Sequence, residues 1–375
     1  MRFLNWPRVA LLAALIALLG IPPQAFTVFA RQDQGPQAPA PAESEPAAPP
    51  SSQKQAPPKP NEPPSSQSQI TVQSNLVNID AVVTDQDGNI VTGLKGENFK
   101  ITDNGVEQQV TNFAPVQAPI TIVMLVEYSA GAWNFLANRS AEWADIFLRD
   151  LKPTDWVALK TFDLRSTLQV DFTHNAAQID ESLRTLGFPS FHEAALFDAL
   201  FGTISELKDV KGKKSILLIT RGFDTISHHR LDETYNLMKE TDVTIFAVGT
   251  LGDFEAMGDT GIGYLQAKNQ LTQFAQMTGG YAWFPRFEGE LPGVFNSVTA
   301  FLRNQYTIGF SPTTPQDGRY HKLVVSIVEA DGSPMMLNDK KGKKHKVLVY
   351  ARPGYTAPKP GDLAPGEWLE RFRSS

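Results

Sequence analysis

The chain has 375 residues, 42% of them hydrophobic, and a formal net charge of −6. This is enough apolar material for a sizeable core, and the acidic balance gives no reason to expect a nucleic-acid partner. The absence of cysteine excludes disulfides, thiolate zinc sites, cysteine nucleophiles and a lipid-modified cysteine.

The first 69 residues have the composition of an export signal followed by a linker. Two arginines precede the apolar run of residues 9–19, and small residues before position 31 offer a cleavage site after Ala30. The run is shorter than the ~20 residues needed to span a bilayer, which favours a cleaved signal peptide at 1–30 over an uncleaved membrane anchor. Residues 31–69 are rich in Pro, Ala, Ser and Gln and are predicted to be a disordered linker. We therefore expect an exported protein, without a membrane span after cleavage, in the periplasm, the cell envelope or the medium.

Two segments with strand patterns flank the middle of the chain. Residues 70–117 contain partly alternating runs and an Asn-Gly hairpin turn at 104–105, and residues 304–357 contain further strand runs. Because the first segment alone would have a thin core, we expect both segments to build one β-sandwich. The lysine-rich stretch 340–346 is interpreted as a solvated hairpin loop between two strands, and residues 358–375 as a tail.

The middle of the chain, residues 118–303, alternates strand and helix patterns. It opens with Ile120–Val126, a near-continuous apolar run typical of a strand buried on both faces of a parallel sheet. The alternation predicts an α/β fold with a doubly wound, mostly parallel sheet, in which the run at 167–172 is an edge strand. Such sheets bind ligands at the carboxyl ends of their strands, where Glu127 and Ser129 follow the first strand.

The order of the motifs resembles the von Willebrand factor type A family, and most closely its exported bacterial subgroup. The resemblance covers nearly all of residues 70–357. It is carried by LVEYSAG, EAALFDAL, SILLITRGFD, VTIFAVGT, LTQFAQMTGGYAW, QYTIGFSP and ARPGY. Each motif is weak alone, and their order makes the resemblance specific. It implies a Rossmann-like sheet and a binding protein instead of an enzyme.

The family holds a divalent metal on an Asp-x-Ser-x-Ser loop, a threonine and a further aspartate. In this chain these five positions fall on Glu127, Ser129, Gly131, Ala194 and Arg221. One ligand is unchanged, one is lengthened, and three are lost, although magnesium needs near-octahedral oxygen ligation. A guanidinium about 5 Å from a divalent cation would be repelled by roughly 7 kcal/mol at an effective dielectric constant of about 20. The resemblance thus implies a degenerate metal site, and we expect no metal and no cofactor.

Two arrangements of the degenerate site are possible. In the first, the Arg221 guanidinium pairs with Glu127 and supplies the charge of the missing cation; in the second, both side chains point into solvent. A Mg²⁺ site of unusual composition is disfavoured. It would need new carboxylate ligands from Asp163, Glu193 or Asp224.

Aromatic residues crowd the loop after the first strand. Tyr128 and Trp133 are of the type that protein interfaces enrich, although Trp133 could equally fill core beneath the loop. We assign no catalytic residue, because the adjacent residues His228 and His229 do not face the same way on a regular element and no nucleophile accompanies them.

These patterns predict a non-enzymatic exported protein that mediates protein–protein interaction or adhesion, without a metal, through the loop face at the carboxyl ends of the sheet. Its partner would be another protein. Two alternatives stay open: a structural component of a cell-envelope assembly, and metal-dependent adhesion through an unusual ligand set.

Overall fold

The computed structural model describes residues 76–115, 119–133, 143–251, 261–315 and 317–359. The segments interpreted as signal peptide and linker, and most of the tail, lie outside these residues. Within the described ranges, every helix is too short or too polar to cross a membrane.

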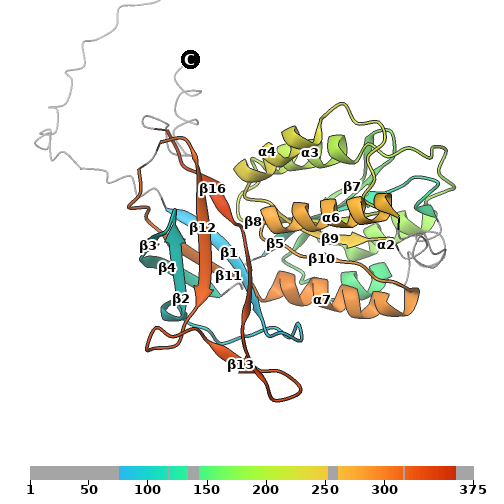
Figure 1. The fold of residues 1–375 in the computed structure, drawn as a ribbon. Helices are drawn as coiled ribbons and strands as arrows, with labels where there is room; N and C mark the ends of the chain where they lie inside the picture. The colour runs from blue at the N-terminus through green and yellow to red at the C-terminus, as the bar shows by residue number, and fades with distance from the viewer. Residues whose placement is uncertain (1–75, 116–118, 134–142, 252–260, 316, 360–375) are drawn as a thin grey trace, which may run out of the picture. The chain divides into compact units, whose positions relative to one another are not determined.

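A six-stranded sheet forms the centre of the α/β body (Figure 1). Its strands are β5 (Ile120–Glu127), β6 (Trp156–Phe162), β7 (Ser166–Thr173), β8 (Lys213–Thr220), β9 (Thr244–Gly249) and β10 (Ala282–Trp283). They lie in the order β10-β9-β8-β5-β6-β7, and all neighbours are parallel except the edge strand β7. Counted along the chain, this is the strand order of doubly wound sheets, so the predicted fold class and the predicted edge strand are confirmed.

Helices cover both faces of this sheet (Figure 1). One face packs on α2 (Ala176–Thr185), α7 (Leu291–Arg303) and the helical residues 143–149; the other packs on α3 (Leu196–Leu207), α4 (Leu231–Glu240) and α6 (Ile262–Met277). Side chains of β5 alternate between the two cores, with Met124 in the first and Val123 and Leu125 in the second. Every residue of β5 is buried, as expected of a central parallel strand.

The two ends of the chain form two four-stranded antiparallel sheets, ordered β15-β1-β11-β4 and β16-β12-β2-β3. From the first end come β1 (Val77–Thr84), β2 (Phe99–Asp103), β3 (Val106–Gln108) and β4 (Val110–Pro115). From the second come β11 (Tyr306–Phe310), β12 (Tyr320–Ile327), β15 (Leu348–Ala351) and β16 (Gly354–Thr356). Both sheets share one core that includes Ile79, Ile101 and Phe310. The predicted sandwich of flanking strands is therefore confirmed, with β11 inserted between β1 and β4.

Turns and strand breaks in the sandwich follow local chemistry. Asn104 and Gly105 have positive φ angles of 48° and 84°, which suit the tight hairpin between β2 and β3. The run HKVLVYARPGY begins in the short strand that ends at Lys346, then gives β15 in one sheet of the sandwich and, after Pro353, β16 in the other. The lysine-rich stretch 340–346 is mostly exposed and forms the turn and second strand of a small hairpin of β13 (Met336–Asn338) and β14 (Lys344–Lys346), as the hairpin-loop interpretation predicts.

The sandwich contacts the α/β body at the amino ends of the parallel strands. Lys213, the first residue of β8, lies with its Nζ atom 3.3 Å from an Asp80 carboxylate oxygen of β1. Arg352 donates a hydrogen bond to the carbonyl oxygen of Thr241, just after α4. The carboxyl ends of the strands therefore face away from this contact, and the site lies there.

Candidate functional site

The polar groups of the candidate site lie where the strand order reverses. β5 and β8 are neighbours in the sheet, although β6 and β7 separate them in the chain. In doubly wound sheets this reversal opens a crevice outside the carboxyl ends of the two strands. Glu127 ends β5, Thr220 ends β8, and Arg221 follows at once.

The Glu127 side chain is fully buried, and each of its carboxylate oxygens accepts two hydrogen bonds. Oε2 accepts from Thr220 Oγ1 at 2.7 Å and from the Arg221 backbone N–H at 2.8 Å. Oε1 accepts from Ser129 Oγ at 2.7 Å and from Arg221 Nε at 2.8 Å, with Arg221 Nη2 also 2.7 Å away. A buried carboxylate is tolerated only when it is paired and bonded in this way. The guanidinium–carboxylate contact is thus present, and the solvent-facing arrangement is not.

Gly131 makes room for the guanidinium of Arg221. A Cβ atom at position 131 would lie 2.0 Å from Arg221 Nη1 and 2.4 Å from its Cζ. Arg221 Nη2 also donates to Ser129 Oγ at 3.0 Å. The glycine and the arginine are therefore sterically coupled, because a side chain at 131 and this position of Arg221 exclude each other.

Ala194 presents no side-chain ligand and is held by its backbone. It is fully buried, its N–H donates to Thr225 Oγ1 at 2.8 Å, and its carbonyl oxygen accepts from the Thr225 N–H at 2.9 Å. The loop that carries Arg221 is thereby tied to the start of α3.

The three carboxylates considered as replacement ligands make other hydrogen bonds. Asp224 accepts from the Phe197 N–H at 3.1 Å and so caps the start of α3. Asp163 accepts from the Arg165 N–H at 3.3 Å, and Glu193 from the His192 N–H at 3.1 Å. Across the described ranges, no three acidic or histidine side chains are grouped so as to hold a metal. A fixed guanidinium among these positions does not fit a divalent cation.

His228 and His229 bind a carboxylate of α3. Their Nδ1 atoms lie 3.0 and 2.7 Å from the Asp198 carboxylate, which also accepts both backbone N–H groups. Burial would raise the pKa of Asp198, but these hydrogen bonds outweigh it and hold the pKa well below its usual value. The histidines therefore brace the loop before α4 and have no catalytic partner assigned to them.

Aromatic side chains lie beside the ion pair. Tyr128 and Trp133 meet edge to face with ring centroids 6.2 Å apart, and Trp133 meets Phe188 at 5.4 Å. The Tyr128 hydroxyl donates to the carbonyl oxygen of Gly187, and burial and then the Asp163 charge raise its pKa. The sequence left open whether Trp133 fills core beneath the loop or lies at the surface. In the structure Trp133 is half-buried and contacts Phe188, whose exposed fraction is 70%.

Further large apolar side chains are exposed in the loops at this end of the sheet. They are Phe191 before α3, Ile226 before α4, Ile262 at the start of α6 and Phe287 before α7. Together with Phe188 they form what we call the loop face. Ile226, Ile262 and Phe287 were not predicted. The sequence offers one signal for such residues, which is a large apolar side chain among polar neighbours.

Comparisons with known proteins give structural similarity alone. No family model and no curated protein matches the chain. The von Willebrand factor type A structure from Catenulispora acidiphila is 12% identical with a TM-score of 0.41, covering 70% of this chain and 74% of that one. The vWF domain of the type V pili tip protein Mfa5 from Porphyromonas gingivalis is 11% identical, TM-score 0.39, covering 50% and 96%. The conserved hypothetical protein BatB from Bacteroides thetaiotaomicron is 13% identical, TM-score 0.37, covering 50% and 100%.

The strand order and the antiparallel edge strand of the α/β body agree with the fold that the motif resemblance implies. The chain has a type A-like fold. In this body, four of the five positions that the resemblance assigns to a ligand set, Glu127, Ser129, Gly131 and Arg221, lie together at the reversal of the strand order around one ion pair.

Proposed function

We propose that this protein binds a protein partner through the loop face, and that Arg221 stands there in place of a metal cation. The observation that carries the proposal is the position of the Arg221 guanidinium, bonded to Glu127 and Ser129 in the space that Gly131 leaves open. The interaction would be non-enzymatic. The export signal expected at residues 1–30 would place it in the periplasm, in the envelope or outside the cell.

A rigid platform supports this proposal. The Ala130 N–H donates to the Phe191 carbonyl oxygen at 2.7 Å, and the Tyr128 N–H donates to the Phe162 carbonyl oxygen at 2.7 Å. These bonds join the loop after β5 to the loops on either side of it. A partner would therefore meet side chains that are already ordered, which lowers the entropic cost of binding.

The composition of the loop face also supports partner binding. Phe188 and Ile262 have exposed fractions of 70% and 77%, and neither fills a core. Interfaces gain most of their binding energy from a few such large side chains near an arginine or an aromatic ring. A bound partner would bury this exposed apolar surface. In a purely structural envelope component whose loop face binds nothing, the same surface would stay in contact with solvent.

Phe188 and Ile262 give the first test. We expect Phe188→Ser with Ile262→Ser to abolish capture of the protein that the wild-type chain retains from an envelope extract, because both substitutions remove exposed anchors. Val106→Ser is the matched control, since Val106 is 50% exposed but lies on β3 of the sandwich. If the loop-face variant captures the same protein as the control, the loop face is not the binding surface.

Divalent cations give the second test. We expect millimolar Mg²⁺, Mn²⁺ or Ca²⁺ to leave the Tm of the wild-type chain unchanged, since a native-state ligand at 100 times its Kd would add about 2.7 kcal/mol. A variant with the family's ligand set restored is the positive control and should gain a Mg²⁺ response. Its substitutions are Glu127→Asp, Gly131→Ser, Ala194→Thr and Arg221→Asp. A chelator-sensitive rise in the wild-type Tm would contradict the cation-free site.

A further inference from the structure

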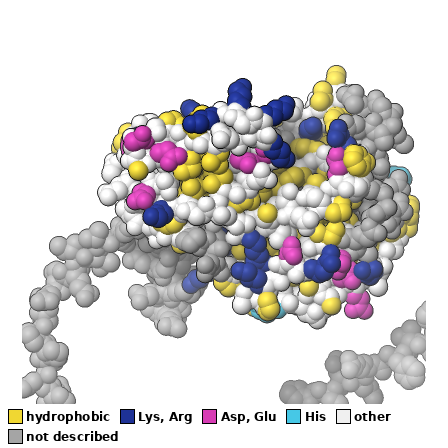
Figure 2. All heavy atoms as spheres, turned by 90° about the horizontal axis from the view of Figure 1, so that it is seen from below, with side chains coloured by type: hydrophobic (Ala, Val, Ile, Leu, Met, Phe, Trp, Pro, Cys, Tyr) yellow, Lys and Arg dark blue, Asp and Glu magenta, His cyan; other side chains and the backbone are white. Residues whose placement is uncertain are grey.

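The β13–β14 hairpin of the sandwich carries a dense positive charge. Five of the seven residues from 340 to 346 are lysines, and all five are exposed. Among the described residues none of the five lysines forms a side-chain ion pair, although Asp85 interacts electrostatically with Lys340 and Asp87 accepts a hydrogen bond from the Lys340 N–H. Asp339, at the start of the turn, accepts hydrogen bonds from the backbone N–H groups of Lys341 and Lys343. Figure 2 shows lysine and arginine side chains in several groups over the face seen from below, some of them beside hydrophobic side chains.

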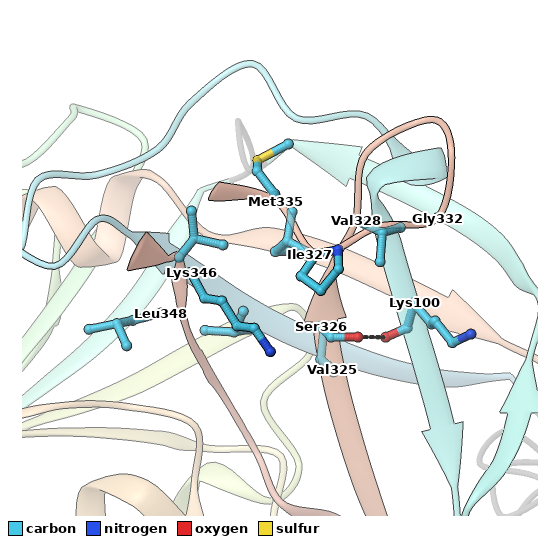
Figure 3. A pocket seen from close by; sticks show the side chains of 12 residues that line it. Lys100, Val325, Ser326, Ile327, Val328, Gly332, Met335, Lys346 and Leu348 are labelled. Atoms are coloured by element: carbon cyan, nitrogen blue, oxygen red, sulfur yellow. Dashed lines mark hydrogen bonds between the residues drawn. The ribbon is translucent and has the colours of Figure 1, made fainter. Parts of the chain in front are cut away.

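A cavity of about 510 Å³ lies next to this hairpin (Figure 3). It is lined by residues 325–328 of β12 and the turn after it, by Gly332, Pro334 and Met335, and by residues 346–349 of β14 and β15. The lining side chains are mainly apolar, and Figure 3 shows Ile327 and Met335 among them. Two lysines, Lys100 and Lys346, complete the lining, but Lys100 is bound to Glu107 with an Nζ–O distance of 2.7 Å. Of these two lysines, Lys346 is therefore the one whose positive charge a ligand in the cavity would meet.

Two unpaired strand edges border the cavity. β15 pairs with β1 on one side and, among the described strands, has no partner on the other. β16 covers the edge of β12 only along Tyr320–Lys322, and the Ile327 carbonyl oxygen accepts from the Met335 N–H, which leaves residues 324–326 uncovered on that side. Free backbone donors and acceptors beside apolar pockets are what an added strand uses.

We propose that this sandwich groove, defined as the lining residues of β12, β14 and β15, binds an extended acidic peptide of a partner protein. The peptide adds to the free edge of β15, places alternate apolar side chains in the cavity, and sets its carboxylates beside the hairpin lysines. Charge complementarity selects this occupant, because the five lysines attract carboxylates, repel a basic strand and give a neutral strand no comparable attraction. The groove is a second site, separate from the loop face and independent of it.

A fluorescent peptide of alternating valine and glutamate, Val-Glu-Val-Glu-Val-Glu-Val, is the probe, with its valine–lysine counterpart as the sequence control. We expect the acidic peptide to bind the full chain and to protect from hydrogen exchange those amides of residues 348–351 that face the free edge of β15. Lys341→Glu with Lys344→Glu should weaken binding by at least roughly tenfold, since 1.4 kcal/mol of lost attraction has that effect. Val325→Trp, which fills the cavity, should weaken it similarly.

The controls separate this groove from the loop face. Lys268→Glu reverses a charge on α6, and Phe188→Ser alters the loop face, so both should leave the affinity for the acidic peptide unchanged. Binding without amide protection would overturn strand addition, and equal binding of the two peptides would overturn the charge argument.

Two other occupants of the groove can be recognised by experiment. Binding of dodecanoate but not of the peptide would assign the groove to an anionic amphiphile instead, and self-association lost in Val325→Trp would assign it to a second copy of this chain. Either result would overturn the proposal.

Discussion

Replacing Arg221 with alanine is expected to lower the free energy of unfolding by about 3 kcal/mol, measured by urea denaturation. The substitution removes one partner of a buried ion pair and leaves a carboxylate without its cation, which typically costs roughly 3–5 kcal/mol. The Glu127 carboxylate keeps donors from Thr220, Ser129 and the backbone, so the lower end of this range applies. Adding Glu127→Gln should recover part of the loss. A coupling energy of zero between the two substitutions would show that the side chains do not interact.

Gly131 tests the same site sterically. Gly131→Ser in the wild-type chain should cost about 1–3 kcal/mol, because the new Cβ atom would overlap Arg221 Nη1. In an Arg221→Ala background the penalty should disappear, because the guanidinium is gone. Gly202→Ser is the control, since a Cβ atom there meets nothing within 4 Å. An equal penalty for Gly131→Ser in both backgrounds would contradict the observed position of the arginine.

Asp155→Asn is expected to have the second large effect, a loss of about 3 kcal/mol at neutral pH. The buried Asp155 carboxylate accepts from the Ile120 N–H at 3.1 Å and the Lys152 N–H at 2.7 Å, and it binds the Arg303 guanidinium. It therefore joins the starts of β5 and β6 to the end of α7. Asp145→Asn is the matched control, because the Asp145–Arg149 pair is exposed and such pairs contribute about 0–1 kcal/mol.

The effect of Asp155→Asn should depend on pH in a defined direction. Burial would raise the pKa of Asp155, but the hydrogen bonds from Arg303, Lys152 and Ile120 outweigh it and lower the pKa. A carboxyl group with a lowered folded-state pKa contributes stability above its unfolded-state value of about 3.9 and loses that contribution as the pH falls through the folded-state pKa. The stability difference between wild type and Asp155→Asn should therefore shrink as the pH falls below about 4. A difference that stays constant down to the acid limit would assign the effect to packing.

Much of the fold could be predicted because the pattern of each strand reports its surroundings. The unbroken apolar run Ile120–Val126 predicted a central strand, and the mixed run at 167–172 predicted an edge strand; both are observed. The division of residues 348–356 between the two sheets of the sandwich could not be predicted. An apolar run shows that a strand will be buried, but it contains nothing about which of two sheets will bury it, and here the chain crosses over at Pro353.

The candidate site could be predicted only in part. The contact between Glu127 and Arg221 followed from the positions that a family resemblance assigned, and spacing along the chain would not have brought them together. The role of Gly131 depends on the direction in which Arg221 extends, which no local pattern records. Ile262 is the first residue of α6 and Phe287 lies in a loop, and neither local pattern records that the side chain stays exposed, so their place on the loop face became evident only with the fold.

The direction of β1 and β11 has a mechanical consequence. Val77, where β1 begins, pairs with Phe310 at the far end of β11, whereas Ala81 pairs with Tyr306, which closely follows α7 at the amino ends of the sheet. The loop face lies at the opposite, carboxyl ends. A force applied between Val77 and a partner held on the loop face would therefore pull the two strands past each other along their length. Ladder hydrogen bonds run across the strands, so such shear loads them together instead of opening them one at a time. The pairing of β1 with β11 therefore transmits tension to the α/β body without the two strands separating one hydrogen bond at a time.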